Sequence, residues 1–366
     1  MNPIRKFKGI YRWLYNEYDP LWGQRLYAQR TLNDKRNTIE FIACDASTNL
    51  RISQLWGGQN GWFEFYNTIG GGINTHLYFP DDWFYDYVDV KLNRWKLCRM
   101  FDDKSFYDFY FYDVNRAETL ASCHEGQWLN GNYSLSTIET VATNCKKAEK
   151  VIIKPSRGSS GGKGIAFWQQ GDGAIEDLLK QYKNCVVQGI IEQHADLSAL
   201  HKESINSIRI MTMLLDGEVK ILSSVLRIGV GKAKVDNISS GGVACGIDGN
   251  GCLKEKTFNA KGNSWIGHPD GLDLKGRKVP AFKECCEICK RLAPRFTRFS
   301  NLISWDFTVD KSGKPVLIEA NLCGGELDFH QMCNGPIFGD ETTTKSMIAR
   351  FYKKKRLIRR WIELLH

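Results

Sequence analysis

The sequence predicts an α+β protein that is built from antiparallel hairpins and divided into several lobes. Two β-type runs flank a glycine-rich loop in "VIIKPSRGSSGGKGIAFW", residues 151–168. Asp216-Gly217 and Ser312-Gly313 each lie between two β-type runs, which is the pattern of a hairpin turn. No internal repeat or low-complexity linker interrupts the chain. These observations favour mixed lobes with antiparallel sheets over a repeat protein.

The clearest elements lie after residue 150, where apolar runs are short and bounded by turn residues. Apolar and β-branched runs of strand length predict strands over 151–155, 164–168, 185–189, 207–215, 218–228, 302–309 and 315–320. Apolar residues at helical spacing predict helices over 174–183 and 281–297, and near the start of 94–118. Residues 1–93 mix short aromatic segments with loops, so we expect a separate N-terminal region there without assigned elements.

The composition describes a chain that can bury a large core. It has 366 residues, of which 42% are hydrophobic and 12% aromatic, and this argues against disorder. No apolar run approaches the ~20 residues needed to span a bilayer, and the N-terminal segment lacks the apolar core of a signal peptide. The 12 cysteines are irregularly spaced, which is typical of reduced thiols in a long cytosolic chain. We therefore expect a soluble, cytoplasmic protein.

One C-x-x-C pair, Cys286 and Cys289, raises the question of a metal site. No second pair stands near it, and its flanks in "AFKECCEICKRLAPRF" have helical periodicity. We therefore interpret the pair as part of a buried helix face.

The net charge of +9 lies at the two ends of the chain. Residues 345–366 carry eight lysines and arginines against one glutamate, the first twenty residues carry a net +2, and residues 21–344 are neutral. A neutral body without a nucleic-acid module argues against nucleic-acid binding. The tail has apolar residues at near-helical spacing: Ile348, Phe351, Ile358, Trp361, Ile362 and Leu365. Such a basic amphipathic helix either makes a peripheral contact with the inner face of a membrane or packs on the body.

The glycine-rich loop after residue 154 is a candidate phosphate site. Lys154 is a charged residue inside an apolar strand, and Gly158, Gly161, Gly162 and Gly164 follow it. A Walker loop and a Rossmann turn both lead into a helix, whereas this loop leads into a strand. A glycine hairpin can still lie over phosphates and donate backbone N–H groups, with Lys154 adding a point charge. The alternative is a surface hairpin with a lysine that extends into water.

A second hairpin, "WDFTVDKSGKPVLIEAN", sets two carboxylates opposite each other. With Ser312-Gly313 at its centre, Asp306 faces Glu319 across the two strands. Like charges in this position destabilise a sheet, and a divalent cation would remove the repulsion. Asn321 lies on the same face as Glu319, and the three side chains offer the hard oxygen ligands that suit Mg²⁺. The alternative is two solvated acids on an exposed face.

Taken together, these motifs resemble the ATP-grasp superfamily over roughly residues 100–335. The resemblance rests on "DDK" at 102–104, "VIIKPSRGSSGGKGI" at 151–165, "VVQGIIEQH" at 186–194 and the "WDFTV…VLIEAN" hairpin. Within the superfamily, "SINSIRIMT", "LRIGVGKAKVDNISSGGV" and "GHPDG" are most similar to the sugar-transfer-associated ATP-grasp family of polysaccharide loci.

The resemblance implies an ATP-grasp fold, in which two α+β lobes grip ATP between antiparallel sheets. It implies a lid subdomain with the glycine-rich loop over 94–190 and a catalytic subdomain with the metal site over 191–344. The N-terminal region, 1–93, and the basic tail helix, 345–366, are then additions to this fold.

The resemblance also implies ATP and Mg²⁺ (or Mn²⁺) as cofactors, and it gives roles to residues in the quoted motifs. The implied nucleotide contacts are Lys104, Lys154, Ser159, Ser160, Gly161, Gly162, Gln188, Gly189, Ile190 and Ile191, with Asp196 or Glu192 at the ribose. The implied metal ligands are Asp306, Glu319 and Asn321. The residues expected at the reaction itself are Arg209, Arg227, Asn237 and His268. Either arginine could hold the transferred phosphoryl group with its planar fork, and His268 could act as a base for the amine.

The leading prediction is an ATP- and Mg²⁺-dependent ligase that joins a carboxylate to an amine through an acylphosphate. The resemblance indicates a uronic acid or another sugar-linked carboxylate in the synthesis of a surface polysaccharide, capsule or O-antigen. There are two alternatives: an ATP-grasp kinase that phosphorylates a sugar-type hydroxyl, and an inactive binding module docked at the membrane. The sequence names neither substrate and gives no oligomeric state.

Overall fold

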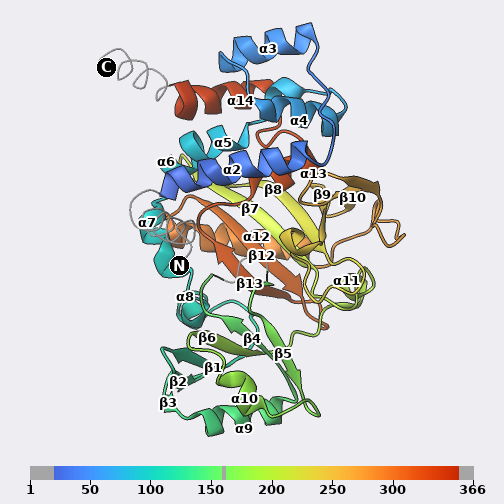
Figure 1. Cartoon of the computed structure of the whole chain (residues 1–366). Helices are drawn as coiled ribbons and strands as arrows, with labels where there is room; N and C mark the ends of the chain where they lie inside the picture. Colours follow the sequence, from blue (N-terminus) through green and yellow to red (C-terminus); the bar gives the residue numbers. More distant parts are fainter. Residues whose placement is uncertain (1–19, 159–161, 354–366) are drawn as a thin grey trace, which may run out of the picture.

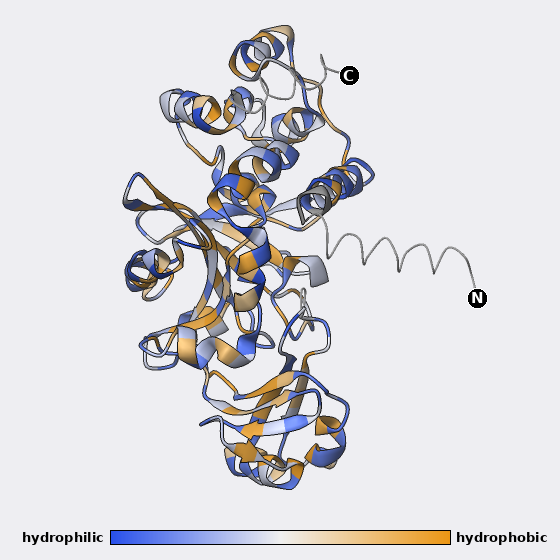
Figure 2. Ribbon diagram, turned by 90° about the vertical axis from the view of Figure 1, so that its left-hand side faces the viewer, coloured by the Kyte–Doolittle hydropathy of each residue, from blue (hydrophilic) through white to orange (hydrophobic). Residues whose placement is uncertain are grey.

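The computed structural model describes residues 20–158 and 162–353 of the chain. A helical region, a seven-stranded sheet and a six-stranded sheet follow one another along the molecule (Figure 1). Apolar residues run along the strands of both sheets (Figure 2), as expected for two sheets that each bury at least one face.

The N-terminal region is helical. Its elements are α2 (Pro20–Arg36), α3 (Ala46–Trp56), α4 (Gly61–Gly70), η1 (Thr75–Leu77), α5 (Asp81–Phe84), η2 (Tyr85–Asp89) and α6 (Val90–Leu92). Their aromatic side chains form one core with α13 (Leu327–Asn334) and with one face of the seven-stranded sheet. Most of these helices are short and packed mainly through aromatic residues, which explains why periodicity alone assigned nothing here.

The six-stranded sheet is antiparallel, with the order β3-β2-β1-β6-β4-β5. Its strands are β1 (Thr119–His124), β2 (Gln127–Asn130), β3 (Leu135–Ser136), β4 (Lys150–Pro155), β5 (Ala166–Gln169) and β6 (Cys185–Gly189). The helices α9 (Ile138–Ala148) and α10 (Ile175–Leu179) join its core, where Val151 and Ile153 are buried. Side chains alternate along a strand, so Ile152 and Lys154 point to the opposite face, where they line a cavity.

The seven-stranded sheet is also antiparallel, with the order β11-β10-β9-β8-β7-β12-β13. Its strands are β7 (Ser207–Leu215), β8 (Glu218–Ile228), β9 (Val243–Ile247), β10 (Leu253–Phe258), β11 (Ser264–Ile266), β12 (Leu302–Val309) and β13 (Pro315–Asn321). Its connections hold α11 (Ala195–Ser198), η6 (Ile238–Ser240), α12 (Phe282–Leu292) and η7 (Ala293–Phe296). Trp305 faces the core that contains α12, whereas Met211 and Val225 face α13 and the N-terminal helices.

Short helices between residues 95 and 111 pack with the seven-stranded sheet. They are α7 (Trp95–Cys98), η3 (Arg99–Phe101), η4 (Lys104–Phe106) and α8 (Tyr107–Tyr110). Phe101 and Phe111 both contact Phe296 of η7, in the same core as Trp305. The six-stranded sheet itself begins at Thr119, but the helices before it contact both sheets, since Tyr133 between β2 and β3 donates to the carbonyl of Ser105 at 2.9 Å. The subdomain boundary expected at residue 94 stays a prediction.

The tail packs on the N-terminal helices as far as the structure describes it. α14 (Glu341–Met347) continues into η8 (Ile348–Lys353). Tyr352 stacks on Trp83 with ring centroids 4.9 Å apart, and Phe351 is buried in the same core. Residues 345–352 thus pack on the body of the protein, which is one of the two arrangements considered for the tail. The other apolar positions of the expected amphipathic helix lie outside the described residues: Ile358, Trp361, Ile362 and Leu365.

The strands predicted over 207–215, 218–228 and 302–309 are confirmed as β7, β8 and β12. The helix expected over 174–183 is shorter, because α10 ends at Leu179. The C-x-x-C pair lies on α12 with Cys289 buried and its thiol free, so the helix-face interpretation is confirmed. Among the described residues, no helix is long and apolar enough to cross a membrane.

Candidate active site

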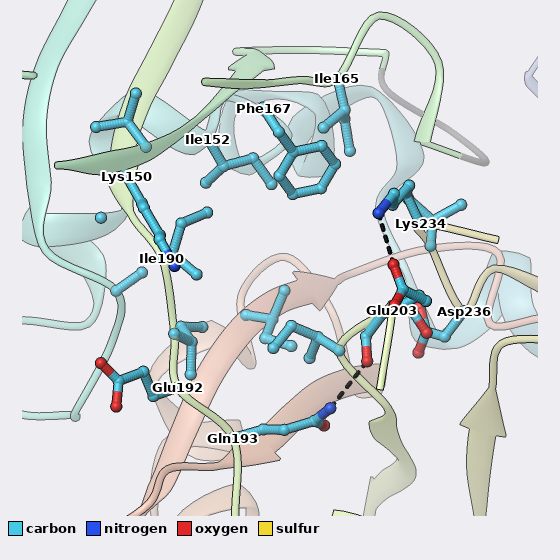
Figure 3. Close-up of a pocket in the computed structure, with 18 of the residues that line it drawn as sticks. Lys150, Ile152, Ile165, Phe167, Ile190, Glu192, Gln193, Glu203, Lys234 and Asp236 are labelled. Carbon is cyan, nitrogen blue, oxygen red and sulfur yellow. Dashed lines mark hydrogen bonds and ion pairs between the residues drawn. The ribbon is translucent and has the colours of Figure 1, made fainter. Parts of the chain in front are cut away.

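A cavity of about 790 Å³ lies between the two sheets. It is lined from β4 and β5 on one side, by the segment after β6, and by residues of β7, β8 and β13. Figure 3 shows Ile152, Ile165 and Phe167 together on the lid side, with Ile190 from the connecting segment. Ile152 and Phe167 are cross-strand partners, and Ile318 lines the cavity from β13. An apolar slot of this kind suits a flat ring system.

The segment after β6 offers backbone polar groups to this slot. Gly189, Ile190 and Ile191 all line the cavity. The amide of Gly189 donates to the carbonyl of Glu118, whereas the backbone groups of Ile190 and Ile191 have no hydrogen-bond partner within the described residues. Unpaired backbone groups beside an apolar slot can bind the polar edge of a heterocycle.

Lys154 extends from β4 into the same cavity. Its Nζ donates to Oε1 of Gln188 at 3.2 Å. Burial, followed by the positive charge of Lys104, lowers the pKa of Lys154 to about 8. An ammonium that is buried beside another cation is stabilised by an incoming anion, so Lys154 is suited to a phosphate.

Lys104 connects the six-stranded sheet to the seven-stranded sheet. Asp103 caps η4 through the amide of Ser105, and the amide of Lys104 donates to the carbonyl of Ser156 at 2.8 Å. The Nζ of Lys104 lies 2.8 Å from Oε1 of Glu319 on β13. Lys104 therefore spans the space between the strand that carries Lys154 and the strand that carries the expected metal ligands.

Asp306 and Glu319 are cross-strand partners on β12 and β13, as the sequence predicts. The predicted register fails nearer the turn, where Val309 pairs with Pro315 instead of Val316. An irregularity between Asp306 and Phe307 leaves Ile318 unpaired and shifts the register by one residue. This β-bulge is what brings Glu319 opposite Asp306.

Two arginines hold the buried carboxylate of Asp306. Arg209 donates from Nε to Oδ1 and from Nη2 to Oδ2, both at 2.8 Å. Arg227 donates from Nη2 to Oδ2 at 3.1 Å. Burial would raise the pKa of Asp306, but the charges of Arg209 and Arg227 outweigh it and hold the pKa below its ordinary value. Asp306 therefore stays ionised although its side chain is buried.

Arg209 and Arg227 also reach other groups. Arg209 binds Glu326 through Nη1. Arg227 donates from Nε and Nη2 to the hydroxyl of Ser207, at 2.9 and 2.7 Å, and that hydroxyl donates to Asp236. The arginines thus link the expected metal ligand to side chains that line the cavity, such as Ser207 and Asp236.

The oxygen ligands expected for a divalent cation are partly engaged by these neighbours. The arginines occupy three of the roughly four lone-pair positions of Asp306. Glu319 is 31% exposed and binds Lys104 with one oxygen, and Asn321 uses only its Nδ2, which donates to the carbonyl of Ser304 at 3.4 Å.

The remaining carboxylate and amide oxygens are hard oxygen ligands of the type that Mg²⁺ prefers. The described residues form no cluster of three His, Cys, Asp or Glu side chains around one metal position. Arginine and lysine compensate both facing carboxylates, so the pair by itself does not require a metal.

Glu192, rather than Asp196, lines the cavity. The carboxylate of Glu192 forms an ion pair with Lys311 at 2.7 Å. Asp196 is exposed on α11, where its carboxylate lies 3.7 Å from the ring of His194. The structure therefore favours the alternative ribose residue over the first choice.

Asn237 does not reach the cavity. Its Oδ1 accepts from the amide of Ser239 at 3.0 Å and caps η6. The preceding residue, Asp236, lines the cavity instead, and its carboxylate accepts from the amide of Ser207 at 2.9 Å. The predicted loop therefore borders the cavity through Asp236, whereas Asn237 is used for the local turn, which the composition of the loop does not reveal.

His268 is a buried structural residue. Its Nε2 donates to the carbonyl of Gly229 at 2.9 Å, and its Nδ1 accepts from the amide of Asp270 at 3.2 Å. Burial lowers the pKa of His268. With both ring nitrogens engaged, the imidazole has no free position for a proton from a substrate, which corrects the expectation of a base.

The glycine-rich loop is described only in part. Ser159, Ser160 and Gly161 lie outside the described residues. Gly162 has a φ of 74°, and a Cβ placed there would lie 3.2 Å from Cγ1 of Val235. The end of the loop therefore packs against the segment after β8, close to Asp236 and the cavity.

The sequence model of the sugar-transfer associated ATP-grasp family matches residues 86–345. No curated protein matches the chain. Solved structures with similar folds include an N5-carboxyaminoimidazole ribonucleotide synthetase in an ADP complex, at 9% identity and a TM-score of 0.39, covering 62% of this chain and 46% of that one.

The biotin carboxylase domain of the Hydrogenobacter thermophilus 2-oxoglutarate carboxylase is 13% identical, with a TM-score of 0.43 and coverage of 70% and 46%. The D-alanyl-alanine synthetase A of Vibrio cholerae is 13% identical, with a TM-score of 0.38 and coverage of 68% and 62%. The chain thus spans about half to three fifths of the length of these three structures.

Proposed function

The chain belongs to the sugar-transfer associated ATP-grasp family, and on this premise we propose that it is an ATP-dependent ligase that joins a carboxylate to an amine through an acylphosphate. One observation carries the proposal. Four cationic side chains, Lys104, Lys154, Arg209 and Arg227, gather around the Asp306–Glu319 pair beside an apolar cavity. Phosphoryl transfer depends mainly on positioning and charge neutralisation, and such a cluster provides both.

The cavity supports binding of the adenosine part of ATP. Ile152, Phe167 and Ile318 provide apolar contacts for the base, and the backbone of Ile190 and Ile191 provides polar ones. Lys154 and Lys104 then neutralise phosphate oxygens at the inner end of the cavity. Both lysines are fixed there by hydrogen bonds or ion pairs to Gln188 and Glu319, so little side-chain freedom is lost on binding.

Asp306, Glu319 and Asn321 would hold a divalent cation in this proposal. When bound, Mg²⁺ would neutralise charge on the phosphate oxygens. Arg209 and Arg227 would hold the phosphoryl group as it moves to the substrate carboxylate, because a guanidinium can bind two oxygens at once. Both arginines must then give up part of their contact with Asp306.

The proposed acceptor is a uronic acid or another sugar-linked carboxylate of a surface polysaccharide, and the family description supports it only as far as an association with sugar transfer. The proposed site of action is the cytoplasm, with a peripheral contact at the inner face of the membrane through the basic tail. The tail proposal rests on the sequence of residues 354–366, since residues 345–352 are packed on the body. Sedimentation of the full chain with anionic and neutral vesicles tests it.

The experiment for the reaction is a substrate panel. The purified chain is incubated with ATP, MgCl₂, uronic acids in free, nucleotide-linked and lipid-linked form, and a set of amines and amino acids. ADP, free phosphate and product mass are measured, with Glu319→Ala as control. Equal amounts of ADP and free phosphate that depend on both substrates, with a product mass equal to their sum minus water, would establish the ligase.

Other results would replace this proposal. A product that gains a phosphoryl group without release of free phosphate would assign the chain as a kinase, which could use the same nucleotide and metal residues. If no substrate in the panel were turned over and the chain did not bind ATP, the inactive binding module would be favoured.

A further inference from the structure

The loop between β13 and α13 brings a third carboxylate to the site, where it is the second that contacts Arg209. Glu326 precedes α13 and binds Nη1 of Arg209 through Oε2. Its backbone has φ 56° and ψ 62°, the left-handed conformation that a residue with a side chain rarely adopts. Such a conformation persists where the surrounding structure enforces it, and it is often found at ligand sites.

The surrounding loop explains how this conformation is enforced. Gly325 lies so close to β12 that a Cβ there would be 2.6 Å from Oγ of Ser304. Gly324 has a φ of 70°, and a Cβ there would lie 3.2 Å from Cη2 of Trp95 and 3.5 Å from Nε2 of Gln24. Because both glycines lack a side chain, the loop packs closely against β12 on one side and against Trp95 and Gln24 on the other. The next residue in the chain, Glu326, then lies with its side chain in contact with Arg209.

Glu326 differs from the other two carboxylates of the site. Asp306 forms ion pairs with Arg209 and Arg227, and Glu319 forms an ion pair with Lys104. Glu326 uses one oxygen for Arg209, and its Oε1 has no hydrogen-bond partner within the described residues. Its side chain is 29% exposed, so the second oxygen can be reached by a ligand.

The neighbourhood of Glu326 is acidic and aromatic. The charges of Asp328, Glu326 and Asp81 add to burial in raising the pKa of the Tyr27 hydroxyl. The side chain of Tyr27 is nevertheless 45% exposed on α2. Carboxylates and accessible aromatic rings both attract ammonium groups.

Polar groups near this position are also left without partners. His330 lies one helical turn after Glu326 and is fully buried, and neither of its ring nitrogens has a hydrogen-bond partner within the described residues. Burial and the positive charges of Arg209 and Arg227 lower the pKa of His330 to about 3, although the charge of Asp306 acts in the opposite direction. Buried polar atoms without partners are expected where a ligand or water completes the site.

We propose that Glu326 binds the ammonium group of the amine substrate. The inference rests on the proposed ligase function and names the residue that selects its second substrate. Lys104 and Arg227 pair with Glu319 and Asp306, whereas Glu326 contacts Nη1 of Arg209. Asp328 is already paired with the buried Lys35 at 2.9 Å, which leaves Glu326 as the carboxylate with an oxygen available to a ligand. In this arrangement the anionic nucleotide binds beside the cationic groups and the cationic amine binds at Glu326. Arg209 contacts both parts of the site, through Asp306 and through Glu326.

The test measures binding of a small amine directly. Ligand-observed NMR compares 2-aminoethanol with its neutral isostere ethylene glycol, using the full chain saturated with ADP and MgCl₂. We expect the wild type to bind 2-aminoethanol at least tenfold more tightly than ethylene glycol. Glu326→Gln keeps an acceptor for Arg209 and the size of the side chain but removes the charge, so we expect the preference to fall below twofold while ADP affinity stays within threefold.

Two further variants keep the result interpretable. Glu255→Gln removes an exposed carboxylate that pairs with Lys275, and it should leave the preference unchanged. Glu326→Gly removes the carboxylate and relieves the left-handed backbone, so it should fold at least as well as the wild type and still lack the preference.

No preference in the wild type, or a preference retained in Glu326→Gln, would overturn the assignment. Loss of ADP binding in Glu326→Gln would overturn it as well, because the residue would then act only by holding Arg209. These outcomes are separate from failure of the ligase proposal: a phosphorylated product in the substrate panel with an intact amine preference would remove the ligase and keep the amine site.

Discussion

Arg209 and Asp306 are cross-strand partners on β7 and β12, joined by two parallel hydrogen bonds of 2.8 Å in a buried position. In this pair, the carboxylate expected at a metal and the guanidinium expected at a phosphoryl group neutralise each other. Binding of ATP must therefore exchange protein–protein contacts for protein–ligand contacts, and the residues of the site differ in how much they contribute to folding.

Removal of Asp306 should destabilise the chain far more than removal of Glu319. In Asp306→Ala, Arg209 and Arg227 lose a buried counter-charge, which costs about 3–5 kcal/mol. In Glu319→Ala, a partly exposed pair with Lys104 is lost, which costs less than about 1 kcal/mol. Urea unfolding followed by tryptophan fluorescence measures both values. Equal losses for the two variants would show that Asp306 is not held as the structure indicates.

Nucleotide binding should weaken as the pH rises above 8. The pKa of Lys154 is lowered to about 8 in the folded chain, so the side chain is charged below that pH and neutral above it. Since a phosphate binds the charged form, the Kd for ATP should be constant near pH 7 and rise about tenfold per pH unit above pH 8. Calorimetry with a chelator present, from pH 6.5 to 9.5, measures this without interference from a metal.

Lys154→Met provides the control for that profile. It should bind ATP weakly at every pH and lose the steep rise above pH 8. An unchanged profile in this variant would assign the titration to another group. The variant should fold at least as well as the wild type, because it removes a buried charge without a carboxylate partner.

His268 should matter for stability and not for proton transfer. His268→Ala leaves the carbonyl of Gly229 and the amide of Asp270 without their partners, which costs about 2–4 kcal/mol. The kcat of the folded variant should stay within about threefold of the wild type, with an unchanged pH–rate profile. A large loss of kcat with an unchanged melting temperature would restore His268 as the base.

The sequence was informative where local rules dominate. Apolar and β-branched runs on either side of the Asp216-Gly217 turn predicted β7 and β8 to the residue. The facing of Asp306 and Glu319 was also predicted, although the structure achieves it through a bulge that the pattern does not show. A one-residue register shift is invisible in a run such as "PVLIEAN", because each residue there suits either face.

The rest of the site depends on contacts between distant segments. Glu326 follows two glycines in a loop with no periodicity, and only the packing of that loop against Ser304 and the N-terminal region brings it to Arg209. Asp236 was missed for the same reason, since its partner Ser207 lies on another strand. Propensity and spacing describe neighbours in the chain and carry no information about such encounters.

The close approach of Gly325 to Ser304 gives a prediction that one double variant can decide. Gly325→Ala introduces a Cβ 2.6 Å from Oγ of Ser304 and 3.0 Å from Cε of Met211, so the loop must move away from β12. Overpacking of this kind costs about 1–3 kcal/mol, and the movement should displace Glu326 from Arg209.

Ser304→Ala removes the nearest clashing atom and leaves the flexible end of Met211, so the double variant should recover at least half of the lost stability. Urea unfolding of the two single variants and the double variant measures the coupling. Additive losses in the double variant would show that the loop is not pressed against Ser304, and the enforced position of Glu326 would lose its physical basis.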